Sequence, residues 1–140
     1  MEWLKWVVDY GVIGLLTAMS FIAVAVAVER RLYYRKISTD AFADKKSLEL
    51  ALTRKLHILA TIASNAPYIG LLGTVLGIML TFYTMGRDGF MDTGKIMVGL
   101  ALAMKATAVG LLVAIPILTF YNFLVRRARE LIFEWEIKNG

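Results

Sequence analysis

Three long runs of this sequence contain almost no charged residue. Residues 10–28 and 58–85 have none, and residues 96–125 have one, Lys105. A helix needs about 20 mostly apolar residues to cross the hydrocarbon core of a bilayer. The sequence therefore predicts an all-α membrane protein with three transmembrane helices. We place the spans at about residues 10–28, 62–85 and 97–122.

The composition agrees with a membrane protein and limits the possible chemistry. Hydrophobic residues make up 59% of the 140 residues, against roughly 45–50% in an average soluble domain. The chain has no cysteine and one histidine, so disulfides and thiolate metal sites are excluded and no metal centre is expected. We find no repeat or linker and expect a single membrane domain, residues 1–140.

The basic residues predict the orientation of the chain. Eight Lys and Arg residues lie in residues 29–57 and four follow Val125. The opposite side has only three, which are Lys5, Arg87 and Lys95. Because cytoplasmic loops carry the excess of Lys and Arg, we expect a periplasmic N-terminus and a cytoplasmic C-terminus. The positive charge is thus assigned to topology and contact with the lipid bilayer, with no nucleic acid as a partner.

The two connections between the spans differ in length. Residues 86–95 are expected to form a short outer turn with three glycines. Residues 29–57 look helical, so the second helix is expected to begin well before the membrane, and the third to continue past Arg126. The expected helix caps are Ser38, Thr39 and Asp40; the apolar positions are Leu48, Leu52, Leu56 and Leu59, and then Leu131, Ile132 and Trp135.

Small residues form a stripe on each of the last two spans, with the same spacing of four, three and four. One interpretation is close helix packing, because small residues let helix backbones approach in a membrane. The other interpretation is a pore lining in which Thr74 and Thr107 supply the polar groups. The pattern leaves both interpretations open. The stripes consist of Gly70, Thr74, Gly77 and Thr81, and of Ala103, Thr107, Gly110 and Ala114.

Each of these two spans also contains a proline. Pro67 and Pro116 each remove a backbone hydrogen bond, and membrane helices tolerate this where neighbouring groups satisfy the freed carbonyl. We expect a helix kink at both prolines.

Two stretches, "ASNAPYIGLLGTVLGIM" and "ALAMKATAVGLLVAIP", resemble the signature sequences of the MotA/TolQ/ExbB proton-channel family, and in particular its short ExbB branch. The resemblance covers the second and third spans. It implies a homopentamer in the bacterial inner membrane, around a single-span ExbD-like partner with an intramembrane aspartate. Protons would be the coupling ion, with no cofactor, and TonB would be driven to import nutrients across the outer membrane. The family's pore threonines match Thr74 and Thr107.

One position departs from the family pattern. Many ExbB and TolQ members have a glutamate early in the third span, where this chain has Leu102. The three apolar runs contain no Asp or Glu, and His57 stands alone at the start of the second helix, as an ordinary surface or packing residue. A proton path usually uses such side chains, so we expect the titrating acid to come from the partner.

Lys105 needs a separate explanation. A charge near the bilayer centre costs about 2.5–3.5 kcal/mol on insertion scales, and a lysine, with a reference pKa of about 10.4, is a poor proton carrier at neutral pH. Its side chain could extend to the headgroups or a water-filled groove, or pair with a partner helix or lipid. Lys105 and Thr107 lie about 200° apart on a helix, so we expect Lys105 at an interface or a crevice rather than in the pore.

Two further functions stay open at this stage. A TolQ-type protein would serve envelope integrity, and a non-conducting scaffold would only organise partners. We find no nucleophile and base pair, phosphate loop or metal-ligand cluster that would indicate an enzyme.

Overall fold

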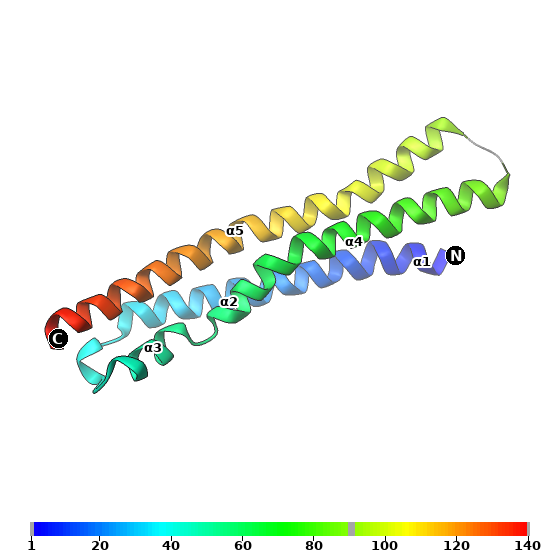
Figure 1. Ribbon diagram of the computed structural model, residues 1–140. Coiled ribbons are helices and arrows are strands. Elements are labelled where there is room, and N and C mark those ends of the chain that lie inside the picture. Colours follow the sequence, from blue (N-terminus) through cyan, green and yellow to red (C-terminus); the bar gives the residue numbers. More distant parts are fainter. Residues whose placement is uncertain (1, 90–91, 140) are drawn as a thin grey trace.

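The computed structural model describes residues 2–89 and 92–139 of the chain, and every regular element in this part is helical. The helices form a long bundle in which α5 extends along the whole length (Figure 1). α1 lies toward the end of the bundle where α4 ends and α5 begins, and α3 lies with the last turns of α5 at the opposite end, which we call the α3 end. The elements are α1 (Glu2–Trp6), the π-helix η1 (Val7–Gly11), α2 (Val12–Lys36), the 3-10 helix η2 (Thr39–Ala41), α3 (Lys45–Thr53), α4 (Leu56–Asp88) and α5 (Thr93–Asn139).

Three helical segments are long and apolar enough to cross a membrane, as predicted. They are Val7–Lys36, Leu56–Asp88 and Thr93–Asn139. Each is longer than the apolar run from which it was predicted, because the helix continues into polar sequence. The orientation of the termini and the single-domain assignment stay predictions.

The third long helix continues past Arg126, also as predicted. In α5 the side chain of Leu131 is buried, and Ile132 and Trp135 pack against the same apolar cluster. The indole Nε1 of Trp135 donates a hydrogen bond to the carbonyl of Phe42 at 3.1 Å. The last turns of α5 therefore hold the segment that connects α2 to α3.

The predicted start of the second helix was wrong. Thr39–Ala41 is a 3-10 turn, and the cap of α3 is Asp44, whose carboxylate accepts a hydrogen bond from the backbone N–H of Ser47 at 2.8 Å. The helix then ends at Thr53, and α4 begins only after Lys55, which has a left-handed φ of 68°. The expected single helix is thus two helices with a sharp break.

Tertiary hydrogen bonds explain this break. The last carbonyls of a helix have no partner within the helix. Here the Arg30 guanidinium donates to the Ala51 carbonyl at 2.9 Å, and the Tyr34 hydroxyl donates to the Leu52 carbonyl. Side chains of α2 therefore satisfy the C-terminus of α3, and the chain turns there.

Other features differ less from expectation. Pro67 and Pro116 lie inside α4 and α5, which continue through them, and the predicted kinks stay predictions. α4 extends to Asp88 and ends at Gly89 with a φ of 66°, a common glycine cap. Phe90 and Met91 of the predicted outer turn lie outside the described residues.

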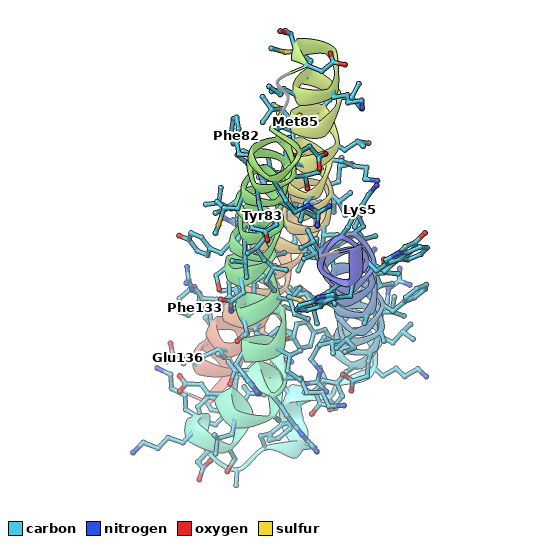
Figure 2. The ribbon with its side chains drawn as sticks, turned by 90° about the vertical axis from the view of Figure 1, so that its right-hand side faces the viewer. Lys5, Phe82, Tyr83, Met85, Phe133 and Glu136 are labelled. Carbon is cyan, nitrogen blue, oxygen red and sulfur yellow. The ribbon has the colours of Figure 1, made fainter. Side chains whose placement is uncertain are left out.

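The helices pack closely against one another, whereas their outward faces are exposed. Most large side chains of the spans are exposed, and Phe82 projects from α4 on the side away from α1 and α2 (Figure 2). A main cluster fills the α3 end between α2, α3, α4 and α5, and a smaller one lies between α2, α4 and α5. The largest fully buried side chains are Leu16, Leu48, Leu52 and Leu59.

Candidate functional site

The α4 and α5 backbones approach closely where the two small-residue stripes meet; we call this contact, from Ala66 to Thr81 on α4, the seam. A Cβ atom on Gly70 would lie 2.6 Å from the Ala106 carbonyl oxygen. One on Gly110 would lie 2.7 Å from the Ala66 carbonyl oxygen. Only glycine fits at these two positions without a backbone shift.

The other stripe residues also meet across the helices. A Cβ on Gly77 would lie 2.8 Å from the Ala103 Cβ, and one on Gly99 would lie 2.6 Å from the Thr81 side chain. Ala114 is buried against Leu16 of α2 and Ala66 of α4. The stripes thus face each other, and α2 covers part of the seam.

Thr74 and Thr107 form the polar centre of the seam. The Thr74 Oγ1 lies 2.9 Å from the Ala103 carbonyl oxygen on α5 and is hydrogen-bonded to the Thr107 Oγ1. Each hydroxyl has one proton to donate. The two bonds are made together when Thr74 donates to Ala103 and Thr107 donates to Thr74. The pair therefore links α4 to α5 and leaves acceptor capacity on the Thr107 oxygen.

The threonine pair lies on the side of the seam turned away from α2. Gly73 lies between α5 and α2, since a Cβ there would lie 2.8 Å from the Ala106 Cβ and 3.0 Å from Val12. At about 100° per residue, Gly73 and Thr74 lie on opposite sides of Gly70, which faces α5. Both threonine side chains are partly buried. Their hydroxyls are therefore close to a surface of the single chain that no other described helix covers.

Lys105 lies elsewhere. It is exposed on α5, and within residues 2–89 and 92–139 its ammonium makes neither a hydrogen bond nor an ion pair. Lys105 and Thr107 are two positions apart on a continuous helix, so they point in nearly opposite directions. The structure brings together the two threonines and does not bring Lys105 to them.

Leu102, which the sequence pattern matches to a glutamate expected in many family members, is 48% exposed and lines a cavity of about 370 Å³ at the N-terminal end of the bundle. Lys5 and Asp9 from the N-terminal segment line the same cavity. Lys5 and Met85 lie at this end of the bundle, and Glu136 at the other (Figure 2).

His57 is exposed in the first turn of α4.

The sequence did not single out two important residues. Gly99 completes the seam opposite Thr81, and it could have been found because it lies four residues before Ala103 and extends the spacing. Arg30 is only 3% exposed, and it forms a bidentate ion pair with Glu29 at 2.7 Å. No sequence signal separates Arg30 from the other arginines near it.

These features define a class of protein: a helical membrane protein whose two longest helices pack through glycine and share a hydrogen-bonded pair of threonines. Residues 26–137 match the MotA/TolQ/ExbB proton channel family, so the chain belongs to this family. The family consists of channel and transport proteins rather than enzymes.

Relatives of similar length match nearly end to end. The biopolymer transport protein ExbB of Aquifex aeolicus is 56% identical over 140 residues, covering 100% of this chain and 95% of the relative. The putative biopolymer transport protein ExbB-like 2 of Helicobacter pylori (strain 26695) is 52% identical over 134 residues, 96% of this chain and 89% of the relative. The biopolymer transport protein ExbB of H. pylori (strain J99) is 51% identical over 137 residues, which cover 98% of this chain and 94% of the relative. The chain fits the short form of ExbB.

Proposed function

We propose that this chain is the channel subunit of an inner-membrane motor that uses the proton-motive force to drive TonB. Membership of a proton-channel family and similarity to biopolymer transport proteins support the transport role. The observation that carries the proposal is the hydrogen-bonded pair of Thr74 and Thr107 in the apolar seam. Hydroxyls there can exchange hydrogen bonds with water or with an acid on a partner.

The titrating acid comes from another chain in this proposal. The three apolar runs of this chain contain no Asp or Glu, whereas proton paths usually use such groups. A homopentamer would place five threonine pairs around an ExbD-like transmembrane helix and its aspartate. The pair lies on the side away from α2, which suits a central position for the seam and an outer position for α2.

The coupling step follows from charge. While the partner's aspartate is ionised, its carboxylate accepts hydrogen bonds from ordered water beside the threonine pair, or from a threonine hydroxyl that turns away from its present acceptor, and these bonds hold it at the seam. Protonation from the periplasmic side removes the charge and weakens these bonds, so the partner helix is released to turn. Loss of the proton to the cytoplasm restores the bonds. The N-terminus is periplasmic in this arrangement, and protons are the coupling ion.

The test removes the hydroxyls and keeps the shape. The double variant Thr74→Val and Thr107→Val is reconstituted with its single-span partner in liposomes, and proton flux is measured. A hydrogen bond to a charged group contributes about 1.5–3 kcal/mol, so we expect proton flux to fall by about tenfold or more, with the assembly intact.

The matched control is Thr119→Val. Thr119 is an exposed threonine on α5, and among the described residues its hydroxyl bonds only to the carbonyl of Ile115 on its own helix, at 2.9 Å. Full flux in this control and in Thr74→Ser is expected. Unchanged flux in the double valine variant contradicts the role of the pair, and complexes of wild-type protein that never conduct protons favour a scaffold.

A further inference from the structure

A groove of about 580 Å³ lies between α2 and α5 and is separate from the threonine pair. Buried apolar side chains form its floor, among them Ala23 of α2, Leu59 of α4 and Ile117 of α5. Exposed apolar side chains form its walls, including Val24 and Phe120. The groove is therefore open toward the surroundings and apolar along most of its length.

One end of this groove is basic. Arg31 and Arg35 of α2 and Arg127 of α5 all line it. The helices α2 and α5 run in the same direction (Figure 1), so positions along them can be compared. Arg31 lies eight residues beyond Ala23, about 12 Å, and Arg127 lies seven beyond Phe120, about 10 Å. The arginines thus gather at one end, and the apolar walls extend away from them.

The charges of these arginines are not balanced within the groove. In the part of the chain that the structure describes, neither Arg31 nor Arg35 forms an ion pair, and no carboxylate lines the groove. Arg127 pairs with Glu130 at 3.3 Å and with Glu134 at 3.8 Å. Two guanidinium groups beside an apolar surface are therefore available to an anion, and their geometry suits phosphate.

We propose that the groove binds one anionic phospholipid. The phosphate contacts Arg31 and Arg35, and an acyl chain lies along Val24, Phe120 and the buried floor. A second copy of this chain would cover the apolar walls but offers no reason for the basic end. Free phosphate would use the arginines but not the walls. A phospholipid suits both parts of the groove, because its phosphate can bind at the basic end and its acyl chain can lie along the apolar walls.

The test is native mass spectrometry of the purified full-length protein with added phosphatidylglycerol or phosphatidylcholine. We expect retention of one phosphatidylglycerol per chain, weaker retention of phosphatidylcholine, and no displacement by inorganic phosphate. The double variant Arg31→Gln and Arg35→Gln should bind phosphatidylglycerol about thirtyfold more weakly, at about tenfold per 1.4 kcal/mol and about 1 kcal/mol for each basic residue at a membrane surface.

A matched double variant separates a site from general surface charge. Lys36→Gln with Arg129→Gln removes the same total charge, one residue from α2 and one from α5, and neither residue lines the groove. This control should bind like the wild type. Equal loss in both double variants, or equal retention in both, overturns the proposal.

Two further variants address the apolar half of the groove. Val24→Trp fills the wall without changing charge, and it should weaken phosphatidylglycerol binding. Unchanged binding in Val24→Trp overturns the placement of the acyl chain. Phe120→Cys introduces the only cysteine of the chain, and efficient cross-linking of two copies through it in the presence of lipid would show a second copy in the groove and overturn the proposal.

Discussion

Along the seam between α4 and α5 the contacting residues are glycine, alanine and threonine, whereas the main cluster at the α3 end is richest in leucine, with isoleucine, tyrosine and a few alanines. The seam brings backbone against backbone, as where Gly70 meets Gly110. At the α3 end, large side chains fill the space, and Arg30 and Tyr34 bond to backbone carbonyls. The two regions of one bundle are stabilised in different ways.

The difference follows from the surroundings of each region. Apolar surface between two apolar helices in lipid gains nothing from leaving water, so association depends on close van der Waals contact. The α3 end carries exposed ion pairs such as Lys45 with Glu136, and its leucines are removed from water by packing. Opposite changes in side-chain size should therefore destabilise the two regions: removing methyl groups lowers the stability of the α3 end, and adding a methyl group lowers the stability of the seam.

The largest expected effect is at the α3 end. Leu52→Ala removes a fully buried side chain, and such a change costs about 2–5 kcal/mol of the free energy of unfolding. Thermal unfolding in detergent, followed by circular dichroism, measures the change. Leu50→Ala is the control, because Leu50 lies on the same helix and is 74% exposed. Equal melting temperatures for the two variants would contradict the packing role of Leu52.

The next largest effect is expected at the seam, where enlarging a side chain, rather than shortening one, destabilises the protein. Gly70→Ala adds one methyl group 2.6 Å from the Ala106 carbonyl oxygen, and overpacking of this kind costs about 1–3 kcal/mol. The same melting experiment applies. Gly86→Ala is the control on the same helix, because nothing lies within 4 Å of its added Cβ. If Gly70→Ala is as stable as this control, the close approach does not hold the seam.

A smaller effect is expected at the break between α3 and α4. Lys55 has a φ of 68°, and the left-handed conformation costs a residue with a side chain about 1–2 kcal/mol. Lys55→Gly relieves this strain but adds chain entropy to the unfolded state, so we expect a gain of about 0.5–1 kcal/mol. Lys46→Gly, which removes the same charge inside α3, should destabilise instead. A loss of stability in Lys55→Gly would show that the lysine side chain matters more than its backbone.

The smallest effect concerns pH and the cap of α3. Hydrogen bonds from Ser47 hold the pKa of the Asp44 carboxyl below its ordinary value of 3.8. Because the folded pKa is the lower one, the cap stabilises α3 above pH 3.8 and this contribution is lost as the pH falls through the folded pKa. The amide chemical shift of Ser47, followed by NMR from pH 5 downward, should report this titration. Asp44→Asn should abolish it, and a titration that persists in Asp44→Asn would assign it to another group.

Much of the fold could be predicted from the sequence. The apolar runs identified the three long helices, and the spacing of Gly70, Thr74, Gly77 and Thr81 identified the face of α4 that meets α5. The continuation of α5 followed from Leu131 and Trp135. Such local periodic patterns are visible in sequence because a helix repeats its faces every 3.6 residues.

The rest depended on contacts between residues far apart in the chain. The break at Lys55 was missed because the groups that end α3 belong to Arg30 and Tyr34, about twenty residues earlier. The groove was missed because its arginines lie on α2 and α5, and in the sequence they look like any basic flank of a span. Helical spacing could suggest that Lys105 and Thr107 diverge, but not what surrounds each of them.

The sequence by itself determined that the chain is helical, that three segments can cross a membrane, and which family it belongs to. These properties depend on hydropathy and on residues at fixed spacing within one helix. Only the tertiary structure decided which faces meet, that Thr74 and Thr107 are hydrogen-bonded, where α3 ends, and that an apolar groove with a basic end lies between α2 and α5. The physical reason is that hydrogen bonds and close packing between helices depend on distances of a few ångströms, which the order of residues along one helix does not specify.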